Sequence, residues 1–544
     1  MLHWLRSYRR DLLAGDLVAG VVVAMMMIPQ GMAYALVAGL PPVAGIYASI
    51  VPSLCYALFG TSMTQSVGPM AIVSLMTAAA LAPLAPAGSG LYHVLAAQLA
   101  LMAGAVLLAS WLLRAGFLAN FFSRPVMSGF TLGATIVIVW DQLGPLTGGG
   151  LEHPHRPSLL LGGGAVLVLV ALRRWLGPLL VRFGVPRRGA DVAVRLVPMA
   201  VVLASLVLVA LLDLPSLGVR TTGEVPSGLP ALNLATSRAH WGLLLQPALL
   251  IGFVIFLVSM SGAQALALRR QEKVHSNWEL LALGAANVGS ALSGGFPVTG
   301  SLSRSAVNFA AGAQTPLASV VTALLLAVAL VAPTGWLALL PLPVLAATII
   351  VAVSGLIEWN TLVTAWRYDR GDAAALLATA AGVLVLGVQG GVVLGVVMSL
   401  ATIVWRASRP HIAVLGRLAG TEHFRNIERY PGTTQPGLLI LRVDANLFFG
   451  NVEAVNERIE DELAARPELR DLVLVLSGVN TIDTTALFAL GEWNTLLSQR
   501  GIRLHLAEVK GPVLDRLRAS SLPATLSGKI YLSTAMAADD LAPA

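Results

Sequence analysis

The chain has 544 residues, of which 56% are hydrophobic and only 12% are charged, and its mean hydropathy is +0.78. A soluble protein carries about 25% charged residues, so this composition excludes an ordinary soluble globular protein. The single cysteine, Cys55, excludes an intramolecular disulfide and a thiolate metal cluster. The nine histidines show no ligand spacing, so we expect no metal and no cofactor.

The run from Leu17 to Leu113 contains no Asp, Glu, Lys or Arg, and since a membrane helix needs about 20 apolar residues, this run alone holds several spans. The candidate spans cover residues 17–30, 36–58, 68–82, 92–112, 117–139, 158–175, 193–212, 243–266, 280–293, 300–312, 315–332, 337–356, 372–387 and 389–406. This gives seven spans in residues 1–240 and seven in residues 241–410. An odd number in each half places the second half upside down relative to the first, which is the inverted repeat of many transporters.

Basic residues predict the orientation of these spans. Arg6, Arg9 and Arg10 precede the first span and predict a cytoplasmic N-terminus by the positive-inside rule. The later basic loops follow even-numbered spans, as Arg173 and Arg174 do after the sixth. Residues 1–410 carry a net charge of +10 and residues 411–544 a net charge of −3. The basic pI therefore belongs to the membrane part and indicates contact with anionic lipid, not with nucleic acid.

Two spans start with helix-breaking residues at matching places in the two halves. The third opens at Ser66-Val67-Gly68-Pro69, and the tenth opens within the segment 294–303. Arg304 follows as the only charged residue between Glu279 and Glu358. A cation in such a span costs about 2.5–3.5 kcal/mol on insertion scales, so it usually has a partner or a task. Helix starts and a guanidinium together favour an anion. The alternatives are that Gly and Pro only kink packed helices, and that the arginine only binds carbonyls of a broken helix.

The C-terminal part has a different pattern. Residues 411–437 are polar and resemble a linker. Strands are then predicted at 438–443, 471–476 and 503–508, and helices at 452–465, 484–499 and 512–519. Strands alternating with helices predict a small α/β domain over residues 438–544. An even number of spans places this domain in the cytoplasm.

Several motifs resemble the sulfate permease (SulP) family of anion permeases and exchangers, whose vertebrate relatives include prestin and pendrin. These motifs are Asp16–Gly20, Ile28–Ala35, Ser66–Pro69 and Gly300–Asn308. The segment Thr481–Thr485 resembles the strand-to-helix turn of a STAS domain. The resemblance implies a polytopic α-helical fold of fourteen spans, divided into a core and a gate, with a cytoplasmic STAS domain. It also implies a homodimer in the inner (cytoplasmic) membrane and a possible cytoplasmic partner of the STAS domain.

By the same resemblance, the core moves like an elevator and binds its anion between the half-helices of spans three and ten. The implied substrate-binding residues are Gln30, Tyr34, Met70, Ala71, Ser301, Leu302, Ser303 and Arg304. For Gln30 the alternative is a polar side chain that satisfies backbone groups in the bundle, and for Tyr34 it is packing at a helix interface. Related STAS proteins also imply that Thr484 is a regulatory phosphorylation site, and here the alternative is an ordinary helix cap.

The chain departs from the family pattern in span eight. Many relatives carry an acidic residue and a lysine there, whereas the matching positions here are Val258 and Gln264. A charge left unpaired in low dielectric is expensive, so the two are expected to be lost together. Because the acidic residue is associated with cation coupling, we expect uncoupled transport or anion exchange.

Sulfate is the expected anion, and bicarbonate, chloride and C4-dicarboxylates are the alternatives. A channel-like conductor and a receptor that signals through the STAS domain remain open. A cation or nucleobase carrier requires carboxylates in spans one, three, eight or ten, and these four predicted spans contain none. No Ser-His-Asp arrangement, metal cluster or phosphate-binding loop indicates an enzyme.

Overall fold

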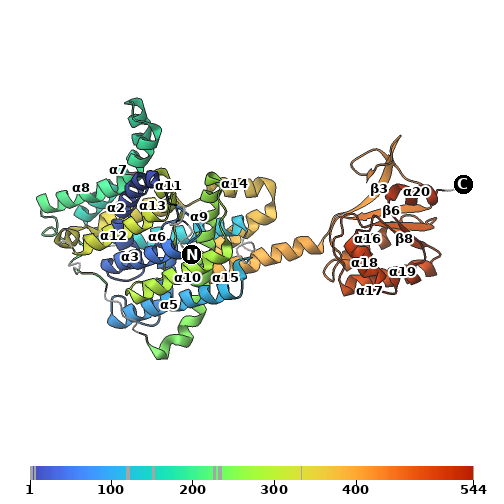
Figure 1. Cartoon of the computed structure of the whole chain (residues 1–544), viewed down its shortest axis with the longest axis horizontal. Coiled ribbons are helices and arrows are strands. Elements are labelled where there is room, and N and C mark those ends of the chain that lie inside the picture. Colours follow the sequence, from blue (N-terminus) through green and yellow to red (C-terminus); the bar gives the residue numbers. More distant parts are fainter. Residues whose placement is uncertain are drawn as a thin grey trace. The chain divides into compact units, whose positions relative to one another are not determined.

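The structure is a computed structural model that describes residue 4 and residues 8–117, 123–149, 153–223, 228–230, 236–331 and 334–542. The chain divides into two compact units, residues 1–399 and 400–544 (Figure 1). The first unit is helical, and the second is built on a β-sheet. Each has its own apolar core.

The helices of the first unit follow the predicted spans in order. They are α2 (Leu13–Val37), α3 (Pro42–Phe59), α4 (Ala71–Leu81), α5 (Gly90–Leu112), α6 (Arg124–Thr147), α7 (Arg156–Arg182), α8 (Arg187–Leu211), α9 (Trp241–Arg270), α10 (Ser276–Leu292), α11 (Leu302–Ala310), α12 (Leu317–Val331), α13 (Leu342–Ser354), α14 (Trp359–Tyr368) and α15 (Arg370–Ser408). Short 3-10 turns lie at Arg10–Leu12, Arg238–His240 and Thr334–Leu339. Within the described residues, nine helical stretches are long and apolar enough to cross a membrane.

Two helices differ from the sequence prediction in an informative way. α15 is interrupted at Gly387, whose φ of 76° and ψ of 172° suit glycine, and it therefore supplies both of the last two predicted spans. The short helix α14 was not predicted. It exposes Trp359, Trp366 and Tyr368, and it is too short to cross a bilayer.

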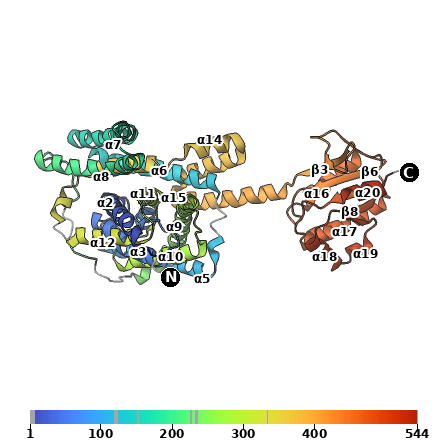
Figure 2. The same ribbon diagram turned by 45° about the horizontal axis from the view of Figure 1, so that its top comes forward.

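The membrane helices form two groups. One contains α2, α3, α5, α9, α10 and α12, and the other contains α6, α7, α8 and α13. Figure 2 shows α7 and α8 in a layer apart from α2, α3, α10 and α12. The groups meet where α2 contacts α8 and α13, and where α11 contacts α8. This arrangement agrees with the predicted division into core and gate.

Small residues allow the helices of the first group to approach closely. A methyl group added to Gly31 of α2 would lie 3.0 Å from the carbonyl oxygen of Gly45 on α3. Apolar side chains gain little by leaving lipid, so membrane helices associate through such close backbone packing. The contact holds α2 tightly against α3, and α2 carries two of the predicted site residues.

One prediction about carboxylates is wrong. α2 begins before the first predicted span and includes Asp16, whose side chain is fully buried. The Asp16 carboxylate accepts hydrogen bonds from the backbone N–H of Gln314 at 2.7 Å and of Thr315 at 3.0 Å, and from the Thr315 hydroxyl at 2.6 Å. These donors lie just before α12, where a negative charge is favourable. Asp16 is therefore engaged in holding two helices together.

The second unit is a seven-stranded sheet covered by helices on both faces. Its elements are β3 (Ile412–Leu418), β4 (Phe424–Asn426), β5 (Gly432–Thr433), β6 (Leu438–Val443), α16 (Val452–Ala464), β7 (Asp471–Val475), α17 (Thr484–Gln499), β8 (Arg503–Ala507), α18 (Gly511–Arg518), α19 (Leu522–Thr525), β9 (Ile530–Tyr531) and α20 (Thr534–Asp540). The strand order is β4-β3-β6-β7-β8-β9, with β5 beside β3. Strands β6 to β9 are parallel, and α16 to α19 pack on the face opposite α20.

The prediction that residues 411–437 form a linker is wrong. This segment contains β3, β4 and β5, and β3 pairs antiparallel with β6 from Ile412 opposite Val443 to Val414 opposite Leu441. Polar residues after the short apolar run obscured the strand in the sequence. Its side chains at Val414 and Leu415 are buried in the cores on opposite faces of the sheet.

Candidate functional site

Two interrupted membrane segments meet end to end. Strand β1 (Val67–Gly68) pairs antiparallel with β2 (Thr299–Gly300), with Val67 opposite Gly300 and Gly68 opposite Thr299. β1 precedes the short helix α4, and β2 precedes the short helix α11. Glycine and proline prevent a continuous helix at both places. The structure therefore brings together the starts of the two predicted half-helices, and we call this junction the seam.

Side chains and backbone lock the seam. The N–H of Ser301 donates to the carbonyl of Ser66 at 3.0 Å, and the N–H of Ser66 donates to the Ser305 hydroxyl at 2.9 Å. The Asn308 amide donates to the carbonyl of Thr64 at 2.9 Å. The five residues that form these hydrogen bonds are all buried away from water. Buried hydrogen bonds of this kind fix the relative position of the two helix starts.

The two helix starts differ in their caps. Ser301 caps α11, where its hydroxyl accepts a long hydrogen bond of 3.5 Å from the N–H of Arg304. Met70 precedes α4 and provides no side-chain cap. The first N–H groups of a helix have no partner within the helix and carry a partial positive charge. The start of α4, at Ala71, therefore presents hydrogen-bond donors to an acceptor at the seam.

Arg304 crosses the seam with its side chain 1% exposed. Its Nη1 donates to the carbonyl of Pro69 at 2.6 Å, just before α4. Its Nε and Nη2 have no hydrogen-bond partner among the described residues. The Tyr34 hydroxyl lies within electrostatic range of the guanidinium. The arginine thus binds a carbonyl of the broken helix and also retains two buried donors for another acceptor.

A cavity of about 290 Å³ lies between the two groups of helices. Of the predicted site residues, Gln30 and Tyr34 on α2 and Ser303 on α11 line it. Thr348 on α13 and Arg173 on α7 line it from the other group. The predicted residues Met70, Ala71, Ser301, Leu302 and Arg304 are not among the described residues that line the cavity.

Sequence reasoning missed Arg173. The predicted sixth span ended at residue 175, which assigned this arginine to the cytoplasmic end. In the structure α7 continues to Arg182, so Arg173 lies well inside the helix. The signal in the sequence was the four-residue spacing from Leu169, which places both residues on one helix face, and both line the cavity.

The remaining predicted positions lie as follows. Val258 and Gln264 both lie on α9, at the positions where the family pattern has a charged pair. Val258 is buried, and Gln264 is exposed. Thr484 is the exposed first residue of α17. Before it, Asp483 caps the helix by accepting from the N–H of Ala486 at 2.8 Å, and its other oxygen accepts from the N–H of Phe449 at 2.9 Å.

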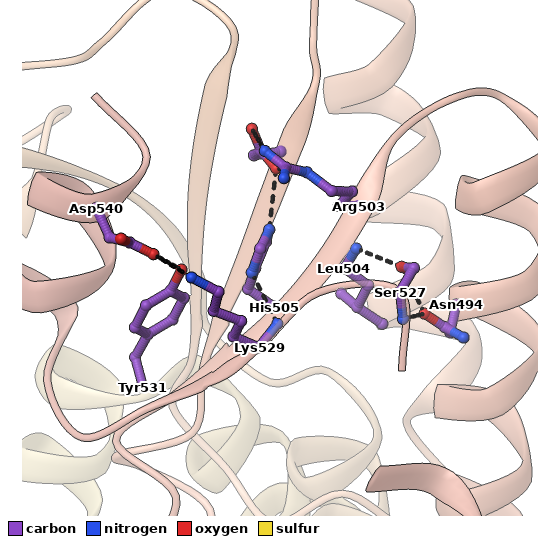
Figure 3. A network of polar contacts seen from close by, with 9 residues as sticks. Asn494, Arg503, Leu504, His505, Ser527, Lys529, Tyr531 and Asp540 are labelled. Atoms are coloured by element: carbon purple, nitrogen blue, oxygen red, sulfur yellow. Dashed lines mark hydrogen bonds and ion pairs between the residues drawn. The ribbon is translucent and has the colours of Figure 1, made fainter. Parts of the chain in front are cut away.

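The sheet unit contains a separate polar network, drawn in Figure 3. Buried His505 bonds through Nε2 to Asp471 at 2.9 Å, and its Nδ1 accepts from the backbone N–H of Lys529 at 3.0 Å. Burial lowers the pKa of the His505 imidazole below its usual 6.5, although the Asp471 hydrogen bond opposes this shift. Asp540 accepts from Lys529 at 2.8 Å and from the Tyr531 hydroxyl at 2.6 Å, and these bonds lower its pKa. The network joins β7, β8, β9 and α20, so it stabilises the sheet.

Fold and site together define a multi-pass membrane transporter with two facing broken helices and a C-terminal α/β domain. A sequence profile described as the sulfate permease family matches residues 13–379, and a profile of the STAS domain matches residues 430–537. The chain therefore belongs to the sulfate permease family, which is a family of transporters and not of enzymes.

Curated relatives match over most of their length. A probable sulfate transporter of Mycobacterium tuberculosis is 37% identical over 536 residues, which cover 95% of this chain and 93% of the relative. Sulfate transporter 4.1, chloroplastic, of Arabidopsis thaliana is 34% identical, with 93% of this chain and 76% of the relative covered.

Solved structures share the fold. The murine Solute Carrier 26 family member A9 anion transporter in its inward-facing state has a TM-score of 0.88 and 21% identity, with 98% of this chain and 93% of that chain covered. The transmembrane domain of a cyanobacterial bicarbonate transporter, BicA, has a TM-score of 0.60 and 23% identity, with 71% and 98% covered. At these identities the likeness concerns the fold alone.

Proposed function

We propose that this protein carries sulfate across the inner (cytoplasmic) membrane and binds it at the seam between the starts of α4 and α11. The observation that carries the proposal is the Arg304 guanidinium, which is buried and has two donors without a partner among the described residues. An unpaired buried donor is costly, so an acceptor that fills this position gains both charge and hydrogen bonds. Curated relatives at 34–37% identity are named sulfate transporters, and this supports the choice of anion.

The binding chemistry follows from the donors at the seam. Sulfate presents four acceptor oxygens, which suit the Nε and Nη2 of Arg304 and the free N–H groups at Ala71, after Met70. Ser301, Leu302 and Ser303 contribute hydroxyls and backbone at the start of α11. Gln30 and Tyr34 add an amide and a phenol from α2. Bound in this way, the anion exchanges its hydration shell for donors that the fold holds in place.

Transport requires the bound anion to reach both sides of the membrane. We propose that the group containing α2, together with α4 and α11, moves as one body against the group containing α7, α8 and α13, in the manner of an elevator. The cavity between the groups is the access route. We also propose that the second group forms a homodimer interface, and that the N-terminus and STAS domain are cytoplasmic.

The proposed transport is not driven by a cation gradient. Val258 and Gln264 offer neither the acid nor the lysine that the family resemblance led us to expect at these positions. The buried carboxylate of Asp16 is already bound by three donors. Sulfate uptake into proteoliposomes should therefore persist without a sodium or proton gradient, and uptake that collapses without one would refute this part.

Regulation through the STAS domain is a further part of the proposal. Thr484 is exposed at the start of α17, where a phosphate is favourable because of the helix dipole. A phosphate next to Asp483 would change the surface offered to a cytoplasmic partner protein. Intact-mass measurement of the protein from cells grown with and without sulfate tests this, and the absence of phosphate in both cultures would rule it out.

The main test is a panel of labelled anions. Purified full-length protein in proteoliposomes should take up sulfate with saturation and turnover typical of a carrier. Bicarbonate, chloride and C4-dicarboxylates are the competitors, and each is added in excess. Saturable uptake of one of these anions in labelled form, together with a lack of sulfate uptake, would replace sulfate with that anion. A flux that does not saturate would favour a channel-like conductor instead.

A further inference from the structure

The two walls of the cavity differ in their charge. The wall formed by α2 and α11 carries the neutral polar groups of Gln30, Tyr34 and Ser303. The wall formed by α7, α8 and α13 is mostly apolar, with Arg173 and Thr348 as its polar members. Among the described residues that line the cavity, Arg173 is the only one with a formal charge. A full positive charge therefore faces the proposed route from the side opposite the seam.

The surroundings of Arg173 hold this charge in place without neutralising it. Its Nη1 donates to the carbonyl of Val351, in the last turn of α13, over a long 3.3 Å. A methyl group added to Gly355, just after that helix, would lie 2.8 Å from Nη2, so the guanidinium rests against a bare backbone. A cation at the carboxyl end of a helix is favourable. No carboxylate of the described residues forms an ion pair with Arg173.

We propose that Arg173 is a second anion-binding position, on the wall that faces Gln30, Tyr34 and Ser303. This inference rests on the proposed function and adds a position that an oxyanion occupies before it reaches the seam. The planar guanidinium has five donors, of which one is engaged with Val351, so it can bind a sulfate oxygen pair. The Arg173 side chain is exposed, and a positive group that lines a cavity raises the local concentration of anions there.

The competing explanation is a purely structural role, in which Arg173 only fastens α7 to α13. The two roles differ in what they change. Loss of an anion-binding residue changes the concentration at which transport saturates, whereas loss of a structural contact changes the maximal rate or the stability of the protein. Arg174 is exposed like Arg173 but is not among the residues that line the cavity, so it provides a matched control for loss of one arginine from the same helix.

The experiment compares Arg173→Gln, Arg173→Lys and Arg174→Gln as full-length proteins in proteoliposomes with labelled sulfate. We expect Arg173→Gln to raise the KM for sulfate by roughly three- to tenfold, with Vmax within about twofold of wild type, because one cation facing a divalent anion is lost in a partly hydrated cavity. Arg173→Lys should restore most of the KM. Arg174→Gln should leave both constants near wild type.

Three results would overturn the inference. The first is an unchanged KM in Arg173→Gln, and the second is a fall in Vmax alone. The third is an equal rise in KM in Arg174→Gln, which would indicate a general electrostatic attraction of the anion and not a binding position. The outcome is separable from that of the proposed function. If Arg304→Gln abolishes uptake while Arg173→Gln behaves as wild type, the seam site stands and the second position falls. If wild type carries a different anion of the panel, sulfate is refuted and the same comparison with that anion tests Arg173.

Discussion

Replacing Arg304 with glutamine tests the seam site most directly. The change removes the charge and two buried donors, Nε and Nη2, that have no partner among the described residues. A hydrogen bond to a charged group contributes about 1.5–3 kcal/mol. Loss of one such bond to the anion therefore weakens binding by roughly 10- to 150-fold, since 1.4 kcal/mol corresponds to a factor of ten. We expect the KM of Arg304→Gln for sulfate to rise by at least this factor, so that uptake falls roughly fivefold or more at the sulfate concentration that half-saturates wild type.

Arg304 also bonds the carbonyl of Pro69, so loss of uptake through misfolding has to be separated from loss of binding. The assay therefore pairs uptake in proteoliposomes with thermal unfolding of the detergent-solubilised protein, with and without sulfate. Wild type should gain thermal stability from sulfate, and Arg304→Gln should not. Arg304→Lys keeps the positive charge but lacks the planar guanidinium that can bind two oxygens at once, so we expect an affinity for sulfate between those of wild type and Arg304→Gln. Unchanged sulfate affinity in Arg304→Gln would refute the reasoning.

Three further predictions concern the seam, a buried carboxylate and the sheet unit. Gly300→Ala places a methyl group against Gln65 and 2.6 Å from the Ser259 hydroxyl oxygen, so uptake should fall by roughly tenfold or more, whereas Gly163→Ala, with no atom within 4 Å, should match wild type in the same assay. Glu279→Gln removes a buried carboxylate that accepts a hydrogen bond from the Tyr56 hydroxyl at 2.7 Å. The free energy of unfolding should drop by about 1–3 kcal/mol, which is measured as a lower Tm, and an unchanged Tm would contradict this. Folding lowers the pKa of His505, so its contribution to stability is complete above the unfolded pKa of 6.5 and is lost as the pH falls below that value. Hydrogen exchange of the β8 and β9 amides should therefore become faster between pH 7.5 and about pH 5.5, after correction for intrinsic rates. His505→Gln should flatten this pH dependence.

The order and type of the membrane helices could be predicted because each span must satisfy its own backbone within an apolar stretch of known length. The breaks before α4 and α11 were also visible, since glycine and proline act locally. Their pairing was predicted only through the repeat and the family resemblance. The hydrogen bonds that fix it, such as Ser66 to Ser305, join residues more than two hundred positions apart and leave no local pattern.

The errors came from boundaries and from partners distant in sequence. Asp16 was placed outside the first span and Arg173 at the cytoplasmic end of the sixth, because a charged residue at the edge of an apolar stretch is assigned to the membrane boundary by composition alone. Strand β3 was missed because its partner, β6, decides its structure. In each case the tertiary contact that settled the assignment, such as Asp16 with Thr315, lies far along the chain.

The buried charged side chains of the membrane unit differ in how many hydrogen-bond partners they have, and this difference identifies the site better than any single motif. Asp16, Glu279 and Arg304 are its buried charged side chains among the described residues. The carboxylates of Asp16 and Glu279 each accept hydrogen bonds from backbone N–H groups and hydroxyls, which stabilise their buried charge. Arg304 alone keeps unpartnered donors, and it does so where two helix starts meet. A mobile anion is the partner that completes this set and can still leave, since a fixed carboxylate there would neutralise the site permanently.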